Sequence, residues 1–158
     1  MNLFRSKEYY IEEVYPKLSL KNEKWVLTGL TALSLSNATA NELYMPIVFC
    51  DSDKTYKISG IVWYIGIGKG NIDYENYVEP YKLSPNILIP TPERAIIECI
   101  KYNDRVIDTG TLLEVILGYI ESPYSDINLL YKVADFFSLD RKELDKWIQE
   151  AEESLEEI

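Results

Sequence analysis

Two carboxylates, Asp51 and Asp53, directly follow the apolar run at 47–50, which is predicted to be a strand. Paired carboxylates at a strand end are ligands that Mg²⁺ prefers, and Gly29 and Thr31 upstream are residue types that can contact a triphosphate. The chemistry of such a set would be nucleotidyl transfer. A third carboxylate on a neighbouring strand and a paired-glycine start are both missing, and Asp-x-Asp before a lysine is also a common turn. We therefore interpret Asp51 and Asp53 as a turn, with a minimal nucleotidyltransferase-like enzyme that uses them with magnesium as the alternative.

The chain has no histidine, which removes the commonest general base and the commonest metal ligand. Ser–His and Cys–His nucleophile pairs are therefore excluded, and the ligands of a structural zinc site are lacking. Cys50 and Cys99 both sit in apolar runs, so we expect two buried thiols rather than a disulfide. We expect no cofactor, no bound metal and no catalysis by this chain.

The charge balance is acidic: 16 lysines and arginines against 26 aspartates and glutamates give a formal net charge of −10. An acidic domain repels the phosphate backbone and the basic residues are scattered, so direct nucleic-acid binding is disfavoured. The chain has no apolar run of about 18 residues, so no membrane span is expected. Its first residues lack the apolar core of a signal peptide, and we expect a cytoplasmic protein. Its 158 residues suit a single domain, 1–158.

The clearest local signal is a strand at 87–89 followed by a sharply started helix. Thr91 can accept a hydrogen bond from an unpaired N–H of the first turn, and Pro92 suits the first helical position because it has no N–H. Glu93 adds negative charge at the helix N-terminus, where the helix dipole favours it. The inner face of this helix is predicted to consist of four apolar residues, Ala95, Ile96, Cys99 and Ile100.

Arg94 lies just inside this helix, and we expect its side chain to point away from the buried face. Its simplest role is an ion pair with Glu98, four residues later, and the alternative is a contact with a partner protein. Tyr74, Tyr77 and Tyr81 form a second candidate contact surface, because tyrosine is enriched at interfaces. Half-buried positions on a strand explain these tyrosines nearly as well.

The predicted elements separate strands from helices along the chain. Two short helices are expected near the N-terminus, at 6–15 and 28–35. The strands are expected in the middle, at 44–50, 61–65, 74–83 and 87–89. Helices occupy the remainder. This order indicates an α+β fold with a small central mixed or antiparallel sheet, N-terminal helices and a C-terminal group of about four helices.

The last helix, at 141–158, is predicted to be acidic and amphipathic. Asp140 precedes Glu143 at a capping-box spacing, and Leu139 and Leu144 flank this start as a hydrophobic staple. An apolar stripe follows at spacings of four, three, four and three residues: Leu144, Ile148, Ala151, Leu155 and Ile158. The stripe needs burial against its own domain or a second copy of the chain. A homo-oligomeric scaffold protein that pairs through this helix is therefore a further interpretation.

Two runs carry a resemblance to a known family. The C-terminal domain of AbiEi-type antitoxins has the run T-P-E-R/K-A-L/I-L/I-D/E, and this chain has a similar one, Pro90-Thr91-Pro92-Glu93-Arg94-Ala95-Ile96-Ile97-Glu98. The helix that opens that domain follows the pattern S/T-x-x-S/T-A-L, which is similar to Thr28-Gly29-Leu30-Thr31-Ala32-Leu33. The runs occur in the family's order, and the antitoxin-like core spans roughly residues 22–140.

As this resemblance implies, the chain would be the antitoxin of a bacterial type IV toxin–antitoxin or phage-defence (abortive infection) pair. Its partner would be a nucleotidyltransferase toxin of the AbiEii type. AbiEi antitoxins usually carry an N-terminal winged helix-turn-helix that binds their promoter. Only about 20 residues precede the matching region here, so we expect this chain to lack that module. Whether neutralisation occurs by contact or indirectly stays open.

Overall fold

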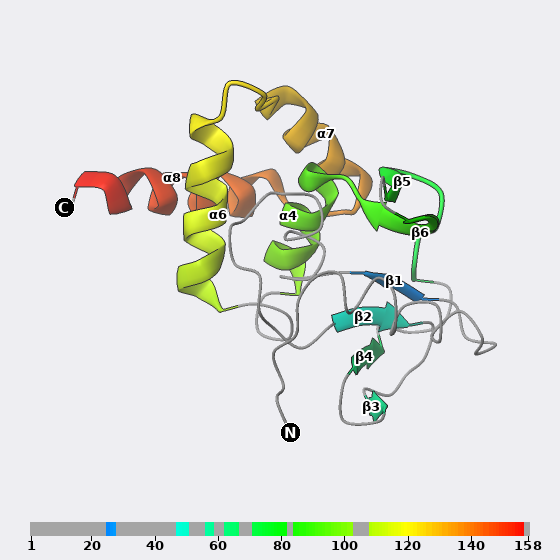
Figure 1. Cartoon of the computed structure of the whole chain (residues 1–158). Helices are drawn as coiled ribbons and strands as arrows, with labels where there is room; N and C mark the ends of the chain where they lie inside the picture. The colour runs from blue at the N-terminus through cyan, green and yellow to red at the C-terminus, as the bar shows by residue number, and fades with distance from the viewer. Residues whose placement is uncertain are drawn as a thin grey trace.

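Figure 1 shows the computed structural model of the chain, which describes residues 25–27, 47–50, 56–58, 62–66, 71–81, 84–102 and 108–156. The helices predicted at 6–15 and 28–35 and the turn predicted at Asp51 and Asp53 lie outside the described residues. Within them, strands precede helices along the chain, which confirms the α+β class.

Four helices follow the strands in the described part of the chain: α4 (Pro92–Lys101), α6 (Thr109–Glu121), α7 (Ile127–Phe136) and α8 (Arg141–Glu156). They form the C-terminal helical group that the sequence predicts. Among the described segments, no helix combines the length and apolar character needed to cross a membrane.

Aspartates cap the starts of α6, α7 and α8. The Asp108 carboxylate accepts a hydrogen bond from the Thr111 N–H at 2.9 Å at the start of α6, and α7 has the same kind of cap. At α8, the Asp140 carboxylate accepts from the Lys142 N–H at 2.8 Å, while the Glu143 N–H donates to the Asp140 carbonyl at 3.0 Å. These bonds satisfy N–H groups that have no partner within the helix. The predicted start of the last helix is therefore confirmed.

One sheet has four strands in the order β1 (Trp25–Leu27), β2 (Ile47–Cys50), β4 (Val62–Gly66) and β3 (Tyr56–Ile58). The inner strands β2 and β4 run parallel, and each outer strand pairs antiparallel with its neighbour. The sheet is therefore mixed. β4 is built from valine, tryptophan, tyrosine and isoleucine before its final glycine, which are residue types that favour strands.

β5 (Val78–Tyr81) and β6 (Ser84–Pro90) form a separate antiparallel pair. The described strands thus make two sheets instead of the single sheet that the sequence predicts. The pairing is irregular between Pro80 and Tyr81. Prolines in both strands lack an N–H to donate, and this limits pairing of the hairpin with further strands.

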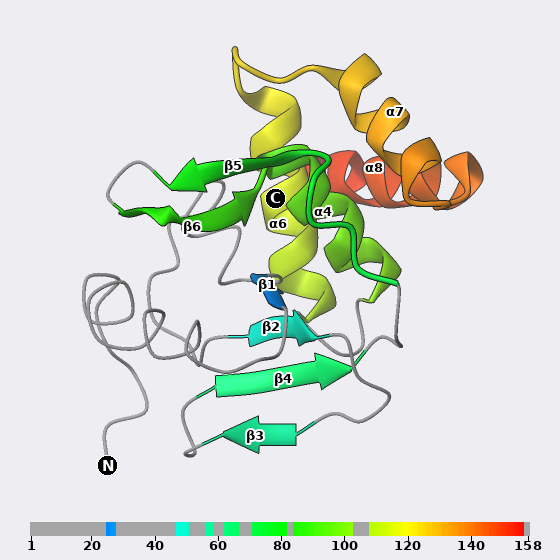
Figure 2. The ribbon, with the colours of Figure 1, turned by 90° about the vertical axis from the view of Figure 1, so that its right-hand side faces the viewer.

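The helices gather on the β1 side of the four-stranded sheet, and β3 forms its far edge (Figure 2). α4 lies between α6 and the β5–β6 hairpin (Figure 1) and contacts α6, α7 and β6. Phe49 of β2 is fully buried and packs edge-on against Tyr102, with ring centroids 4.8 Å apart. This contact joins the sheet to the C-terminal end of α4.

Every residue of α4 from Arg94 to Ile100 is buried. The predicted inner face is confirmed, because its four apolar residues are at most 3% exposed. The burial extends beyond this face, since Ile97 is also fully buried. α6, α7 and β6 all contact α4, and a helix that is buried around most of its surface is a core helix.

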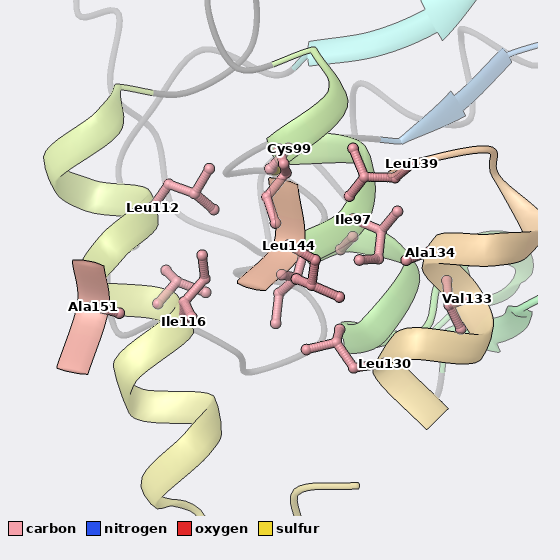
Figure 3. Close-up of a cluster of buried hydrophobic side chains, with 14 of the residues drawn as sticks. Ile97, Cys99, Leu112, Ile116, Leu130, Val133, Ala134, Leu139, Leu144 and Ala151 are labelled. Atoms are coloured by element: carbon pink, nitrogen blue, oxygen red, sulfur yellow. The ribbon is translucent and has the colours of Figure 1, made fainter. Parts of the chain in front are cut away.

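The helical core packs around α4 (Figure 3). α6 contributes Leu112, Val115 and Ile116, α7 contributes Leu130, Val133 and Ala134, and α8 contributes Leu144 and Ala151. Leu139 and Cys99 are also buried there. The first part of the predicted α8 stripe is therefore covered by α6 and α7 of the same chain. Ile127 is 37% exposed because it occupies the first helical position of α7, at the edge of the core.

Candidate functional site

The start of α4 is built as its sequence predicts. The Thr91 hydroxyl accepts a hydrogen bond from the Arg94 N–H at 3.3 Å, and Pro92 occupies the first helical position. The Thr91 N–H donates to the Tyr77 carbonyl at 2.8 Å, which joins the helix start to the beginning of β5. Glu93 lies in the first turn, where its charge complements the helix dipole.

Arg94 is fully buried, so the prediction that its side chain points away from the core is wrong. Its Nε lies 3.2 Å from Glu98 Oε1, which confirms the predicted ion pair. Its Nη1 donates to the Asn76 carbonyl at 2.8 Å, and its guanidinium carbon lies 4.8 Å from the centroid of the Phe137 ring. Arg94 therefore joins α4, the turn before β5 and the end of α7 inside the molecule.

Glu98 shares this buried position and is only 4% exposed. Burial raises the pKa of its carboxyl group from 4.5 to about 7, because desolvation disfavours the charged form. The Arg94 guanidinium opposes this shift, and Lys101 opposes it more weakly, while the negative charge of Asp73 adds to it. This buried carboxyl group therefore titrates near neutral pH.

Tyr119 of α6 links three elements, a role that the sequence analysis missed. Its hydroxyl donates to Glu93 Oε2 at 2.8 Å and accepts from the Asp126 N–H at 2.9 Å. Burial is the main reason that the pKa of the hydroxyl is raised, so it remains protonated and able to donate. A single tyrosine within an otherwise aliphatic helix stretch was the available signal, because a partly buried tyrosine hydroxyl needs a partner.

The three tyrosines predicted as a contact surface occupy different positions. Tyr74 and Tyr77 are half-buried, and the side chain of Tyr81 is not among those described. Tyr77 has a φ of 57°, which is uncommon for a bulky residue. Its ring packs edge-on against Phe136, with centroids 5.5 Å apart, and lies 6.3 Å from Phe137.

Exposed aromatic side chains on and before α7 are a feature that the sequence analysis did not single out. Tyr124 is 91% exposed in the turn that precedes α7, and Phe136 is 46% exposed at the end of the helix. The Phe136–Phe137 pair was the available signal, because neighbouring helical residues are about 100° apart and their side chains point in different directions. Large exposed aromatic residues are typical of protein-contact surfaces.

A shallow hollow of about 390 Å³ lies beside α7 and is lined by Asn128, Tyr131, Lys132 and Arg141. Arg141 is already bound to Asp135, with Nη2 2.7 Å from Oδ2, and its guanidinium lies over the Tyr131 ring at 5.4 Å. Both partners of this ion pair are at least half exposed, so it contributes little to stability. We assign this hollow no ligand.

The remaining predicted site residues lie outside the described part of the chain. They are Asp51 and Asp53 of the alternative enzyme site, and Thr28, Gly29, Thr31, Ala32 and Leu33 of the first antitoxin-like run. Among the residues that are described, the structure holds no group of three or more acidic or cysteine side chains placed to bind a metal ion.

Comparison with known proteins gives no identification: no model of a protein family matches this chain, and no curated protein matches it either.

Proposed function

We propose that this chain is an antitoxin-like protein of a bacterial type IV toxin–antitoxin or phage-defence pair, and that it neutralises a nucleotidyltransferase-type toxin. The observation that carries the proposal is the structure of the antitoxin-like run at 90–98. Thr91 caps α4, Pro92 occupies its first position, and Arg94 and Glu98 pair in its interior. The run thus combines a cap with a buried ion pair, which is a more specific arrangement than a helix start alone.

The proposal predicts that a nucleotidyltransferase toxin is encoded beside this gene, and co-expression with that toxin tests it. We expect the chain to relieve the growth inhibition that this toxin causes. We also expect the purified chain to leave the promoter fragment unshifted at physiological salt, because its net charge of −10 opposes binding to DNA. Continued growth arrest despite a folded, expressed chain would contradict the proposal.

Matched variants separate this proposal from the enzyme alternative. Asp51→Ala and Asp53→Ala should protect cells as the unchanged chain does, because the proposed function does not use these carboxylates. Loss of protection in these variants, with an unchanged melting temperature, would favour magnesium-dependent nucleotidyl transfer instead.

A further inference from the structure

The irregular segment 71–77, which we call the cover segment, crosses α4 before the chain enters β5 (Figure 2). Arg94 of α4 donates from Nη1 to the Asn76 carbonyl at 2.8 Å and pairs through Nε with Glu98 Oε1 at 3.2 Å. One guanidinium therefore joins the cover segment to the buried Glu98 side chain. We propose that the cover segment is pH-sensitive: it closes over α4 when Glu98 is protonated and opens when Glu98 is charged. This inference does not depend on the proposed function.

Contacts near both of its ends hold the cover segment closed. Ile72 and Tyr77 pack against the helical core, and both are only partly buried. The Thr91 N–H donates to the Tyr77 carbonyl at 2.8 Å, and Arg94 adds its hydrogen bond to Asn76. The cover segment contains no helix or strand, and such segments open at a lower free energy than the packed helices beneath them.

The cover segment can move as a unit about Tyr77. The Asp73 carboxylate accepts hydrogen bonds from the Glu75 N–H at 2.9 Å and the Asn76 N–H at 2.7 Å, so residues of the segment itself hold its turn together. Tyr77 has a φ of 57°, which strains the backbone of a bulky residue. Opening at Tyr77 therefore relieves strain and leaves the turn at 73–76 intact.

Glu98 makes this opening depend on pH. Burial raises the pKa of its carboxyl group to about 7, and the negative charge of Asp73 in the cover segment adds to the shift, while Arg94 and Lys101 of α4 oppose it. The side chains that α6, α7 and β6 bury in the described core are apolar, so these elements add no buried charge beside Glu98. Opening lets water reach the carboxylate and moves Asp73 away, and both changes favour the charged form.

Amide hydrogen exchange of the full chain tests the inference at two N–H groups near the start of α4. The Thr91 N–H is bound to the Tyr77 carbonyl of the cover segment, whereas the Ala95 N–H is bound within the helix, to the Thr91 carbonyl at 2.9 Å. After correction for intrinsic exchange rates, we expect the Thr91 amide to exchange at least about tenfold faster than the Ala95 amide. Low urea concentrations should leave Thr91 exchange unchanged, because local opening exposes little surface.

The pH dependence of opening is measured against Glu98→Gln, which keeps the shape of the side chain but cannot titrate. Glu98 binds its proton more tightly in the closed state. The opening constant of the unchanged chain, relative to the variant, should therefore rise about tenfold or more between pH 4.5 and pH 7. Glu75→Gln removes an exposed carboxylate of the same segment and should keep the pH dependence of the unchanged chain.

Two exchange results would overturn the inference. Equal protection of the Thr91 and Ala95 amides would show that the cover segment opens only together with the helix. A ratio of opening constants that is constant with pH would show that Glu98 does not control opening. The carbon-13 shift of the Glu98 carboxyl group in the unchanged chain gives a check that needs no variant: we expect a midpoint near pH 7, and a midpoint near pH 4.5 would also contradict the inference.

Discussion

At the scale of single residues, Glu98 makes stability depend on pH. Its pKa is about 7 in the folded chain against 4.5 in its ordinary environment. Because the pKa is higher in the folded state, the contribution of Glu98 to the free energy of unfolding is fully present below pH 4.5. This contribution is lost as the pH rises through 7. Glu98→Gln keeps the shape of the side chain but cannot titrate.

We therefore expect the free energy of unfolding of the unchanged chain, relative to Glu98→Gln, to fall as the pH rises from 4.5 to 7. Urea denaturation at several pH values in this range measures the difference. Asp108, whose pKa is lowered by hydrogen bonds from Thr111, is common to both proteins and cancels in the comparison. A difference that is constant with pH would show that Glu98 does not titrate in this range.

Arg94 provides a second prediction at this scale. Because both side chains of the pair are buried, Arg94→Met leaves a carboxylate without its counterion and should cost about 3 kcal/mol of stability. The double variant Arg94→Met with Glu98→Leu removes both charges and should be clearly more stable than Arg94→Met alone. Chemical denaturation of the single and double variants measures this coupling. A loss below about 1 kcal/mol for Arg94→Met would indicate a solvent-exposed pair instead.

At the scale of elements, the start of α4 depends on one hydroxyl group. Thr91→Ala removes the acceptor of the Arg94 N–H and should lower the free energy of unfolding by about 1 kcal/mol. Thr91→Ser keeps the acceptor and should retain most of the stability. Thr109→Ala alters an exposed threonine at the start of α6, whose cap is Asp108, and serves as the control. Thermal unfolding of the three variants checks the prediction, and equal losses in Thr91→Ala and Thr91→Ser would contradict it.

At the scale of the whole molecule, α4 is the element on which α6, α7 and the β5–β6 hairpin pack. Ile96 is fully buried in it, so Ile96→Asp places a charge in the core at a cost of several kcal/mol. That cost is comparable to the whole stability of a domain, about 5–15 kcal/mol, and we expect the variant not to fold. Ile96→Val loses one methylene group, should cost about 1 kcal/mol and should stay folded. Circular dichroism distinguishes the outcomes, and a folded Ile96→Asp chain would show that α4 is peripheral.

The amino-acid sequence by itself determined the features that depend on neighbouring residues. Thr91 and Pro92 marked the start of α4, because capping acts over three residues. The spacing of Arg94 and Glu98 predicted their ion pair, because residues four apart are adjacent on a helix. The order of strands and helices indicated the α+β class, and the period of the apolar residues identified the inner face of α4.

Only the tertiary structure decided which charged and aromatic groups are inside. Arg94 is buried because the Asn76 carbonyl and the Phe137 ring, which are distant in sequence, close over it. Phe136 stays partly exposed because the adjacent Phe137 takes the inner position. Periodicity within one helix shows which residues share a face, but not how many faces its neighbours cover. The number of covered faces depends on packing between distant segments. Here α4, which its sequence predicts to be amphipathic, is buried as the central helix of the core.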